Sequence, residues 1–541
     1  MDSKAMYRKI LRAAMLTGLI LIITVGTMLM GGCTTQTEGT TGPEETTETP
    51  VTYTIADTTG DWGYPSPYTH YSRGPGYIRM SFIFDTLVWK DKSEFVPALA
   101  ESWEYLESEN AYVFNLREGV TWHDGEEFNA EDVVFTINYV EEHPLPFVTL
   151  QGPSGIEKAQ ALDNYTVKLF LEQPYAAFLN DVAGTLAILP EHIWSDVEKP
   201  EEFSGPEAVV GTGPYKLVNY SKEHGTYLYK AYKNYYLGEP SVDKLKFVKV
   251  NQQMIPAALK QGEVDAGDIP AELVQEMQSE DFTAIQAPCG WNAKLMLNHK
   301  DAPLSNKEFR HALAYAIDRE SLVETVLRGY ATPGSAGMVP PDSEWYNSDI
   351  KQYDYDPEKA KELLKELGYK YSDDSFTKDG EPLELELLTS PRAPFPDVAE
   401  FIEKELEKIG VTVALRSLEA KSLDARVEAW EFDLSVYGHG GLYEPSILNK
   451  VITGKGFNSA RYTESKELNQ LLQAQLQEMD HSKRKELVAQ VQEVYAEELP
   501  ALTLYYPNWY WAHNGEVELF YTNGGVASGI PVPLNKLAFV R

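Results

Sequence analysis

The sequence has only two cysteines, Cys33 and Cys289, among its 541 residues. Basic residues are also scarce: 47 Lys and Arg stand against 82 Asp and Glu, giving a formal net charge of −35. Because phosphate binding needs clustered Lys and Arg to release counterions, this acidic excess argues against nucleic acid as a partner. It also argues against docking on anionic lipid through a basic surface. The charge therefore excludes classes of partner without naming a ligand.

Motifs for metal, nucleotide or nucleophilic chemistry are absent from the sequence. The ten histidines are scattered, with neither HExxH nor the Cys/His spacing of a zinc site. There is no P-loop, and Gly211-Thr-Gly lacks the third glycine of a dinucleotide loop before it meets Pro214. No G-x-S-x-G nucleophile elbow occurs. Among 82 acidic residues, a chance pair of carboxylates says almost nothing about glycosidase chemistry. The sequence predicts no catalytic residue, metal site or cofactor.

The first 33 residues differ from everything after them. A basic start is followed by an uncharged, mostly apolar run at residues 13–30, and then by Gly31-Gly32-Cys33. This pattern predicts a secretory signal peptide at residues 1–32. It resembles a lipobox, in which Cys33 becomes the lipidated first residue. The alternative is an uncleaved transmembrane helix, since 18 residues is near the lower limit for a span. Either way the rest of the chain is expected outside the cell, anchored to the membrane.

A flexible Thr/Glu tether is expected at residues 33–52. Residues 34–50 contain eight Thr and four Glu and no aliphatic or aromatic residue, so they cannot bury apolar surface. If Cys33 is lipidated, Cys289 has no disulfide partner within the chain. We interpret Cys289 as a small core residue, with a catalytic thiol as the alternative.

From Tyr53 onward the pattern mixes strands and helices without an obvious repeat. Residues 90–205 have the pattern of an α+β unit, and residues 211–288 are rich in strands. A capping box at Ser305-Asn-Lys-Glu308 predicts a helix start. Further along, strands and helices alternate, which is typical of a parallel sheet with helices on both faces. The ranges in order are strand 383–388, helix 397–409, strand 411–416, helix 421–430 and strand 432–437. The Gly- and Pro-rich tail from 507 to 541 is expected to complete an earlier domain.

Aromatic residues are plentiful, with 33 Tyr, 10 Trp and 20 Phe, and several cluster in predicted loops. On loops they supply rigid contact area for a ligand that must be released again; the alternative is core or interlobe packing. His439 lies in a glycine-rich loop expected to follow a parallel strand, where open α/β sheets bind ligands. A buried structural histidine is the alternative for this residue.

Motifs along nearly all of residues 53–541 carry a family resemblance. They include Val96-Pro-Ala-Leu-Ala-Glu-Ser-Trp103, Phe114-Asn-Leu-Arg-Glu-Gly-Val-Thr-Trp-His-Asp-Gly125 and Phe128-Asn-Ala-Glu-Asp-Val-Val134. Others follow in order at residues 211–217, 310–318, 328–333, 356–364 and 499–502. The sequence closely resembles family 5 extracellular solute-binding proteins, the dipeptide-, oligopeptide- and nickel-binding receptors of ABC importers.

The resemblance implies an α/β fold: a two-lobed periplasmic-binding-protein-like clamp of type II, the large peptide-binding type. Lobe I would combine residues 53–88, 206–288 and 506–541, with an extra α+β domain inserted at 89–205. Lobe II would be residues 289–505. Crossover strands near Pro288 and Tyr505 would form the hinge. The ligand would be buried between the lobes on closure, and the closed state would dock on the permease. The signature around His123 would belong to the fold and not to the binding site.

The ligand class is open between three alternatives. In peptide-binding members an Asp in the loop before a (Glu/Asp)-Pro pair holds the peptide amino terminus, and the corresponding loop 438–445 has Gly441 near that position. Peptide is the expected ligand, with a nickel chelate or an oligosaccharide as alternatives. The candidate ligand-binding residues are Tyr71, Arg73, Trp291, Asn292, His439, Gly441, Tyr443 and Trp509.

The sequence therefore predicts a membrane-anchored, extracytoplasmic solute-binding protein that serves ABC permease subunits. A monomer without a cofactor or enzymatic activity is expected. Two other functions stay open from the residues alone: a secreted hydrolase, motivated by carboxylates and aromatics, and a sensory or adhesive surface protein that uses the same clamp.

Overall fold

The structure is a computed structural model that describes residues 50–71, 74–145, 148, 150, 154–287 and 290–540. The signal segment, the lipobox-like Cys33, most of the tether, Arg73 and Cys289 lie outside the described residues.

A seven-stranded sheet is assembled from three distant stretches of the chain, in the order β12-β22-β11-β1-β10-β9-β8. Strand β1 pairs in parallel with β10 and β11, whereas the other pairs are antiparallel. We refer to the part built on this sheet as lobe I. Its strands are β1 (Thr52–Asp57), β8 (Tyr215–Ser221), β9 (Thr226–Ala231), β10 (Lys244–Lys249), β11 (Ala266–Ile269), β12 (Thr283–Gln286) and β22 (Tyr510–His513).

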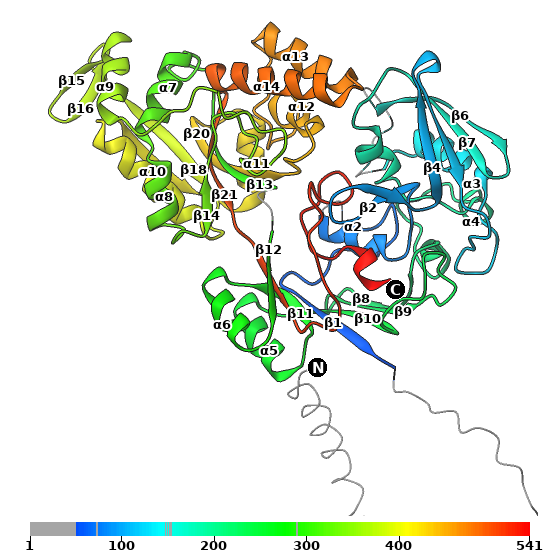
Figure 1. The fold of residues 1–541 in the computed structure, drawn as a ribbon. Helices are drawn as coiled ribbons and strands as arrows, with labels where there is room; N and C mark the ends of the chain where they lie inside the picture. Colours follow the sequence, from blue (N-terminus) through cyan, green and yellow to red (C-terminus); the bar gives the residue numbers. More distant parts are fainter. Residues whose placement is uncertain are drawn as a thin grey trace, which may run out of the picture. The chain divides into compact units, whose positions relative to one another are not determined.

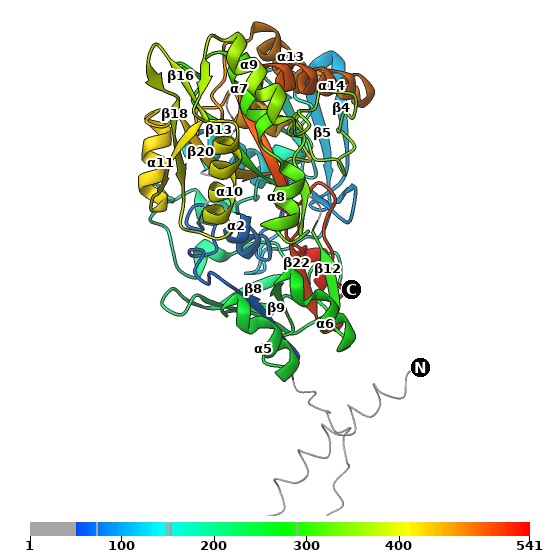
Figure 2. The same ribbon diagram turned by 90° about the vertical axis from the view of Figure 1, so that its left-hand side faces the viewer.

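Both faces of the lobe I sheet are covered. Alternation along β1 directs Tyr53 and Ile55 into one core and Ala56 into another. Helix α2 (Gly74–Ser81) supplies Tyr77 and Ile78 to the first core, and α5 (Ile255–Gln261) and α6 (Val274–Ser279) pack into the second. Figure 2 shows α5 and α6 beside β12 and β22.

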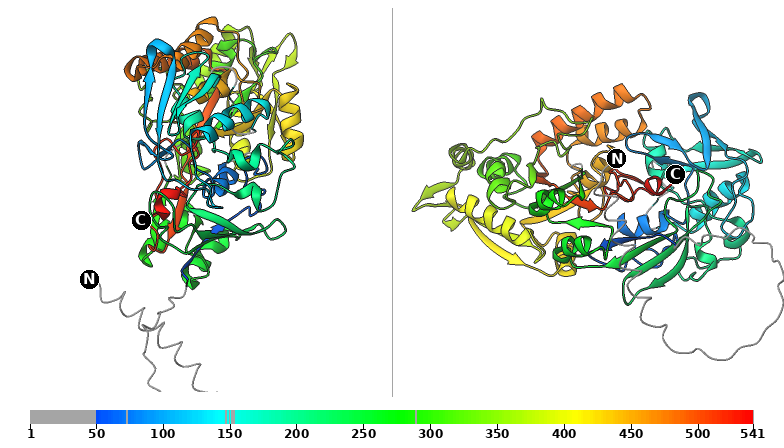
Figure 3. Two further views of the ribbon diagram at one scale, coloured as in Figure 1. Left: turned by 90° about the vertical axis from the view of Figure 1, so that its right-hand side faces the viewer. Right: turned by 60° about the horizontal axis from the view of Figure 1, so that its bottom comes forward.

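The C-terminal tail returns to lobe I, as expected from its composition. Trp89 Nε1 donates a hydrogen bond to Asn535 Oδ1 at 2.9 Å. Buried Lys536 forms an ion pair with buried Asp85. These contacts join the tail to the segment at residues 85–89, and Figure 3 shows the C-terminus on the same part of the molecule as the blue segments from early in the chain. The last turn of helix, η7, covers Lys536–Phe539.

A four-stranded antiparallel sheet, in the order β4-β5-β7-β6, forms an additional α+β part within lobe I. Its helix α3 (Ala130–Glu142) starts with a capping box between Asn129 and Asp132. The strands are β4 (Ala100–Leu106), β5 (Ala111–Leu116), β6 (Ile156–Asp163) and β7 (Thr166–Leu171); β2 (Val88–Lys90), β3 (Phe95–Pro97) and helix α4 (Glu191–Trp194) lie beside them in sequence.

A six-stranded mixed sheet, in the order β14-β21-β13-β20-β18-β19, carries the part that we call lobe II. Strand β18 is parallel to β19 and β20, which confirms the predicted parallel pairing, but β13, β14 and β21 add antiparallel strands. The strands are β13 (Trp291–Leu297), β14 (Ala331–Pro333), β18 (Glu384–Thr389), β19 (Thr412–Ser417), β20 (Leu434–Gly440) and β21 (Ala501–Pro507).

The helices of lobe II flank this sheet (Figure 1). They are α7 (Lys307–Ala316), α8 (Arg319–Thr325), α9 (Pro357–Glu366), α10 (Phe395–Lys408), α11 (Ala420–Glu428), α12 (Ser446–Ile452), α13 (Lys466–Gln477) and α14 (His481–Glu498). A small sheet of β15 (Lys370–Ser372), β16 (Ser375–Lys378) and β17 (Glu381–Pro382) lies after α9 in sequence.

Three local expectations need correction. The helix cap is Asn306 and not Ser305, because Asn306 Oδ1 accepts from the Phe309 amide at 3.0 Å. Strand β20 continues through Gly440, so His439 lies inside the strand and not in a loop after it. The second crossing falls after Pro507, at residues 508–509, because Tyr505 still pairs with Ala293 inside the lobe II sheet.

Candidate ligand-binding site

Two aromatic side chains mark the crossings between the sheets. Trp291 opens β13, and Trp509 lies between β21 and β22. Their ring centroids are 5.9 Å apart, and Phe395 of α10 stacks on Trp291 at 6.4 Å. The amide of Ala287 donates to the Trp509 carbonyl oxygen at 2.8 Å, so the two crossing segments are hydrogen-bonded to each other. Since Trp509 remains 37% exposed, the pair offers an accessible aromatic surface at the junction of the lobes.

The glycines of β20 make room for the indole ring of Trp291. Trp291 pairs with Gly440 and Ala293 pairs with Gly438 across the two strands. A Cβ atom at Gly438 would come within 2.0 Å of the Trp291 ring, and one at Gly440 within 3.3 Å. Gly438 is therefore required by the packing of Trp291 in the protein itself.

A group of polar side chains occupies the opposite face of the same strands. Asn292 and Lys294 share a face of β13 because alternate residues of a strand point the same way. His439 is the cross-strand partner of Asn292, and Thr503 of β21 is the partner of Lys294. Asn292 and Lys294 are fully buried, and His439 is 5% exposed. The interior of lobe II thus contains a basic side chain and several hydrogen-bonding groups.

Few described residues satisfy this polar group. Lys294 Nζ donates to the Asn458 carbonyl oxygen at 2.6 Å, and Asn292 Nδ2 donates to Thr503 Oγ1 at 3.4 Å. Neither ring nitrogen of His439, nor Oδ1 of Asn292, has a hydrogen-bond partner among the described residues. Burial lowers the pKa of Lys294 to about 7. Burial, and then the nearby positive charge of Lys294, hold the pKa of His439 well below its usual value, so the imidazole is neutral.

Lobe I contributes an acidic group at the carboxyl ends of its parallel strands. Asp57 ends β1, and Asp268 follows Gly267, the partner of Ala56. Asp57 forms an ion pair with Arg79 and accepts a hydrogen bond from Trp62 Nε1 at 2.9 Å. This end of a parallel sheet is where ligands of open α/β folds bind.

Asp268 has no counter-ion among the described residues. It accepts from Gln252 Nε2 at 2.7 Å and forms no ion pair with a described Lys, Arg or His. Burial, followed by the charge of Asp57, raises the pKa of Asp268 to about 7. Its neighbour across the sheet is Trp511 of β22. A ligand cation would find an uncompensated carboxyl group and an aromatic ring here.

The two lobes touch each other in the structure. Ser446 Oγ at the start of α12 donates to Asp181 Oδ2 at 2.9 Å, and Gln477 Nε2 donates to Gln173 Oε1 at 2.7 Å. A Cβ built on Gly441 would lie 3.4 Å from the Ser528 carbonyl oxygen of the tail. The structure therefore shows the two lobes in direct contact.

Several of the predicted ligand-binding residues come together. Trp291 pairs with Trp509, and Asn292 pairs with His439. Gly441, with a φ of +82°, lies at the lobe contact. Whether any of them contacts a ligand stays a prediction.

Of the other three predicted residues, Tyr443 lies near Trp291 and the tail, because a Cβ on Gly290 would come within 3.1 Å of its ring and one on Gly524 within 3.6 Å of its Cβ. Buried Tyr443 donates to Asp342 Oδ2 at 2.6 Å. Tyr71 is 57% exposed, with its ring 6.1 Å from Trp62. Arg73 is outside the described residues.

Two charged residues of the site were missed from the sequence. Lys294 interrupts an otherwise largely apolar strand, Trp291–Leu297, and a charge inside such a strand is a usable signal for a buried polar site. Asp268 gave no comparable signal, because acidic residues are abundant and its neighbours in space are far away in sequence.

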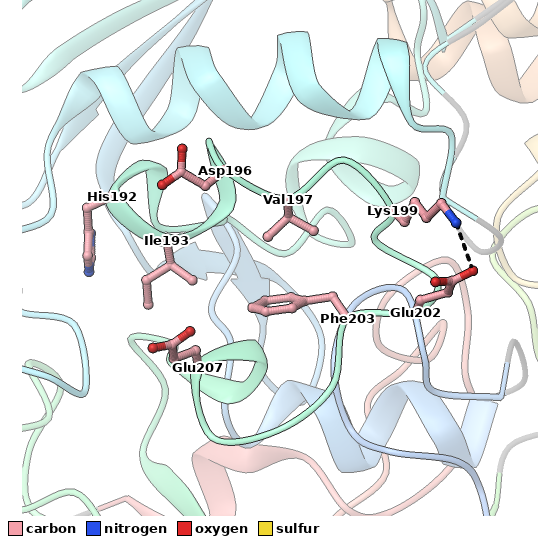
Figure 4. A pocket seen from close by; sticks show the side chains of 8 residues that line it. All are labelled: His192, Ile193, Asp196, Val197, Lys199, Glu202, Phe203 and Glu207. Atoms are coloured by element: carbon pink, nitrogen blue, oxygen red, sulfur yellow. Dashed lines mark hydrogen bonds and ion pairs between the residues drawn. The ribbon is translucent and has the colours of Figure 1, made fainter.

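A separate cavity of about 540 Å³ lies on the inserted part of lobe I and is shown in Figure 4. Phe203 and Val197 form its apolar side, and Lys199 forms an ion pair with Glu202 at 3.3 Å on its rim. Every residue that lines it falls within 192–207, so it includes neither crossing. We assign it no role in ligand binding.

Comparison with known proteins decides the family. Residues 94–447 match the model of the bacterial extracellular solute-binding proteins, family 5, middle region. The chain belongs to this family. As a family 5 solute-binding protein it has the two-lobed type II clamp, acts outside the cytoplasm with an ABC permease, and is not an enzyme.

Relatives of this family 5 protein differ in their named ligands. A dipeptide-binding protein of Escherichia coli is 29% identical over 443 residues, which cover 76% of this chain and 81% of the relative. A heme-binding protein A of Haemophilus influenzae is 30% identical over 65% of this chain and 67% of its own length. The structure of NikZ from Campylobacter jejuni in complex with Ni(L-His) is 26% identical, with a TM-score of 0.73 over 88% of this chain and 97% of NikZ.

No helix within the described part of the chain is both long enough and apolar enough to cross a membrane.

Proposed function

We propose that this solute-binding protein captures peptides between its lobes. The observation that carries the proposal is Asp268, a carboxyl group at the carboxyl ends of β1 and β11 that no Lys, Arg or His in the described part of the chain neutralises. A peptide with a free amino terminus supplies the missing ammonium group. Asp268 would then do in lobe I what an Asp at the position of Gly441 does in lobe II of peptide-binding members. The similarity to the dipeptide-binding protein of Escherichia coli supports the same class of ligand.

The test is a thermal-shift screen with the purified chain over peptides, nickel with and without histidine, and oligosaccharides. Binding of a solute to the folded state raises the melting temperature by mass action. We expect peptides to raise it, and the same peptides with an acetylated amino terminus to bind about 10- to 100-fold more weakly, the usual value of a charge-assisted hydrogen bond. Absence of any shift with peptides would contradict the proposal.

A matched pair of variants locates the ammonium subsite. Asp268→Asn removes the carboxylate, whereas Glu263→Gln removes the same charge from an exposed position nearby in the chain. Only Asp268→Asn should abolish the preference for free over acetylated amino termini. Equal behaviour of the two variants would place the amino terminus elsewhere.

A nickel chelate is the second candidate, because a specific observation favours it. His439 is neutral and both of its ring nitrogens lack a partner among the described residues, so one of them could complete the coordination of a nickel–histidine complex. The named ligand of NikZ supports this alternative. In the same screen, a shift produced by nickel with histidine and not by peptides would decide for it. The aromatic pair Trp291 and Trp509 at the crossings could also bind a sugar ring, so a shift produced by oligosaccharides is the third possible result of the screen.

We further propose the anchoring and the domain boundaries given by the sequence. Lipidation at Cys33, or retention of the apolar helix, would hold a monomer at the membrane; loss of fatty-acid labelling in Cys33→Ala would decide between the two. Lobe I would be residues 53–88, 206–288 and 506–541, with 89–205 inserted, and lobe II residues 289–505. The strand composition of the three main sheets supports this division, except that β21 extends lobe II to Pro507.

A further inference from the structure

The buried polar group of lobe II contains more hydrogen-bonding capacity than its surroundings use. An ammonium group has three donors, and Lys294 uses one of them on the Asn458 carbonyl oxygen. Neutral His439 has one donor and one acceptor, and neither has a partner in the described part of the chain. Within the described ranges, the amide of Asn292 makes one long hydrogen bond through Nδ2, and its Oδ1 has no partner. Buried polar groups in folded proteins are normally satisfied, so this concentration calls for an explanation.

Lys294 is the basic member of this polar group, and the group contains no acidic side chain. Lys294 forms no ion pair with any acidic residue that the structure describes. The other members, Asn292, His439 and Thr503, are neutral. Apolar neighbours such as Met296 and Tyr437 close this face of the sheet. A buried amine without a counter-ion loses its proton more readily, and an anion from outside the chain that pairs with it would favour the charged form.

The group lies at the end of its strands that faces the lobe contact. Asn292 follows Trp291, the residue beside Trp509 at the crossing. His439 precedes Gly440 and Gly441, and Gly441 packs against the tail of lobe I. A ligand held between the lobes would therefore meet Asn292 and His439 first and Lys294 one pleat further in.

We propose that Lys294, His439 and Asn292 form a subsite for an anionic group of the ligand, and that a carboxylate is the group it takes. Lys294 Nζ supplies the charge and up to two further donors, His439 supplies one ring N–H, and the Asn292 amide supplies a third partner once it turns its Nδ2 inward. For a peptide, the carboxylate is its carboxyl terminus. This inference rests on the proposed function, and the opposite ligand end would pair with Asp268.

The experiment compares two tripeptide libraries, one with free carboxyl termini and one amidated, on the full chain by thermal shift and calorimetry. We expect the wild-type protein to prefer the free acids by about 10- to 100-fold. Lys294→Met should lose this preference. Lys455→Met, at an exposed position in the loop that provides the Asn458 carbonyl, should keep it.

Each outcome separates the inference from the proposed function. Equal binding of acids and amides by the wild-type protein overturns the carboxylate subsite and leaves peptide binding intact. Binding of neither library overturns the peptide function and the subsite with it. If Lys294→Met keeps the preference, Lys294 is structural and the group is satisfied by water.

A second variant tests the subsite independently, in case Lys294→Met does not fold. His439→Gln keeps a donor and an acceptor but alters their positions, and we expect it to weaken acid binding by about 3- to 10-fold. The melting temperature of each variant without peptide shows whether it is folded. An unchanged acid preference in a folded His439→Gln variant would remove His439 from the subsite.

Discussion

Replacing Lys294 by Met should stabilise the protein in the absence of ligand, and it should do so in a pH-dependent way. Burial lowers the pKa of Lys294 from 10.5 to about 7, so the unfolded chain binds its proton more tightly than the folded one. Between these two values the unfolded state carries more protons, and the stability of the wild-type protein rises with pH. Below about pH 7 the lysine is charged in both states, and the full penalty for burying the charge applies.

The structure sets the size of this penalty. The difference between 10.5 and about 7, at about 1.36 kcal/mol for each tenfold change in proton affinity, gives an upper bound of about 5 kcal/mol. Replacement of buried charged groups by apolar side chains of similar volume has gained about 1–4 kcal/mol in other proteins. We therefore expect Lys294→Met to raise the free energy of unfolding by about 1–4 kcal/mol at about pH 6. The gain should shrink towards zero as the pH approaches 10.5.

Urea denaturation of the wild-type, Lys294→Met and Lys455→Met proteins at about pH 6, 8 and 10 measures this effect. Lys455 is exposed, so its substitution should leave stability within about 0.5 kcal/mol at every pH. If Lys294→Met is less stable than wild type at pH 6, or if its effect does not change with pH, the reasoning is wrong. The hydrogen bond from Lys294 to Asn458 would then outweigh the cost of the buried charge.

Three further outcomes are expected. Gly438→Ala should lower the free energy of unfolding by about 1–3 kcal/mol in urea titrations, because its Cβ would come within 2.0 Å of the Trp291 ring; an unaffected variant would mean that the ring moves freely. Ser446→Ala removes the hydrogen bond to Asp181 between the lobes and should weaken peptide affinity by about 3- to 10-fold. The preference for peptides with a free carboxyl terminus over amidated peptides should not change. Affinity for a carboxylate should be constant below about pH 7 and fall above it as Lys294 loses its proton, with proton uptake detected by calorimetry in two buffers; a flat profile between pH 6 and 9 would contradict this.

Much of the architecture could be predicted from the sequence because it depends on local patterns. The alternation of strands and helices from 383 to 437 predicts β18, α10, β19, α11 and β20, and the parallel pairing of β18 with both neighbours confirms it. The cap at Asn129 is a short-range pattern of the same kind. Such features need no knowledge of distant partners.

The site was harder to predict because it depends on register. That Asn292 lies opposite His439, and Lys294 beside them, follows from the pairing of strands separated by more than a hundred residues in sequence. Glycines at 438 and 440 suggested a loop open to a ligand, whereas they accommodate Trp291 across the sheet. The second crossing lies at Trp509, a few residues later than the predicted position near Tyr505. It does so because β21 continues to Pro507, where it still pairs with β14 of lobe II.

The position of β22 has a consequence for how the chain folds. In the sheet order β12-β22-β11, a strand near the end of the chain separates two strands that are consecutive in sequence. Gly267 pairs with Ala512, so the partners are 245 positions apart in the sequence. The lobe II sheet is complete once β21 is present, but β12 joins the lobe I sheet only through β22, which follows β21 in the chain. Contacts of such high sequence separation form slowly. Lobe I is therefore the last to complete its sheet, and a chain that ends before Tyr510 would leave β12 with no neighbour to join it to that sheet.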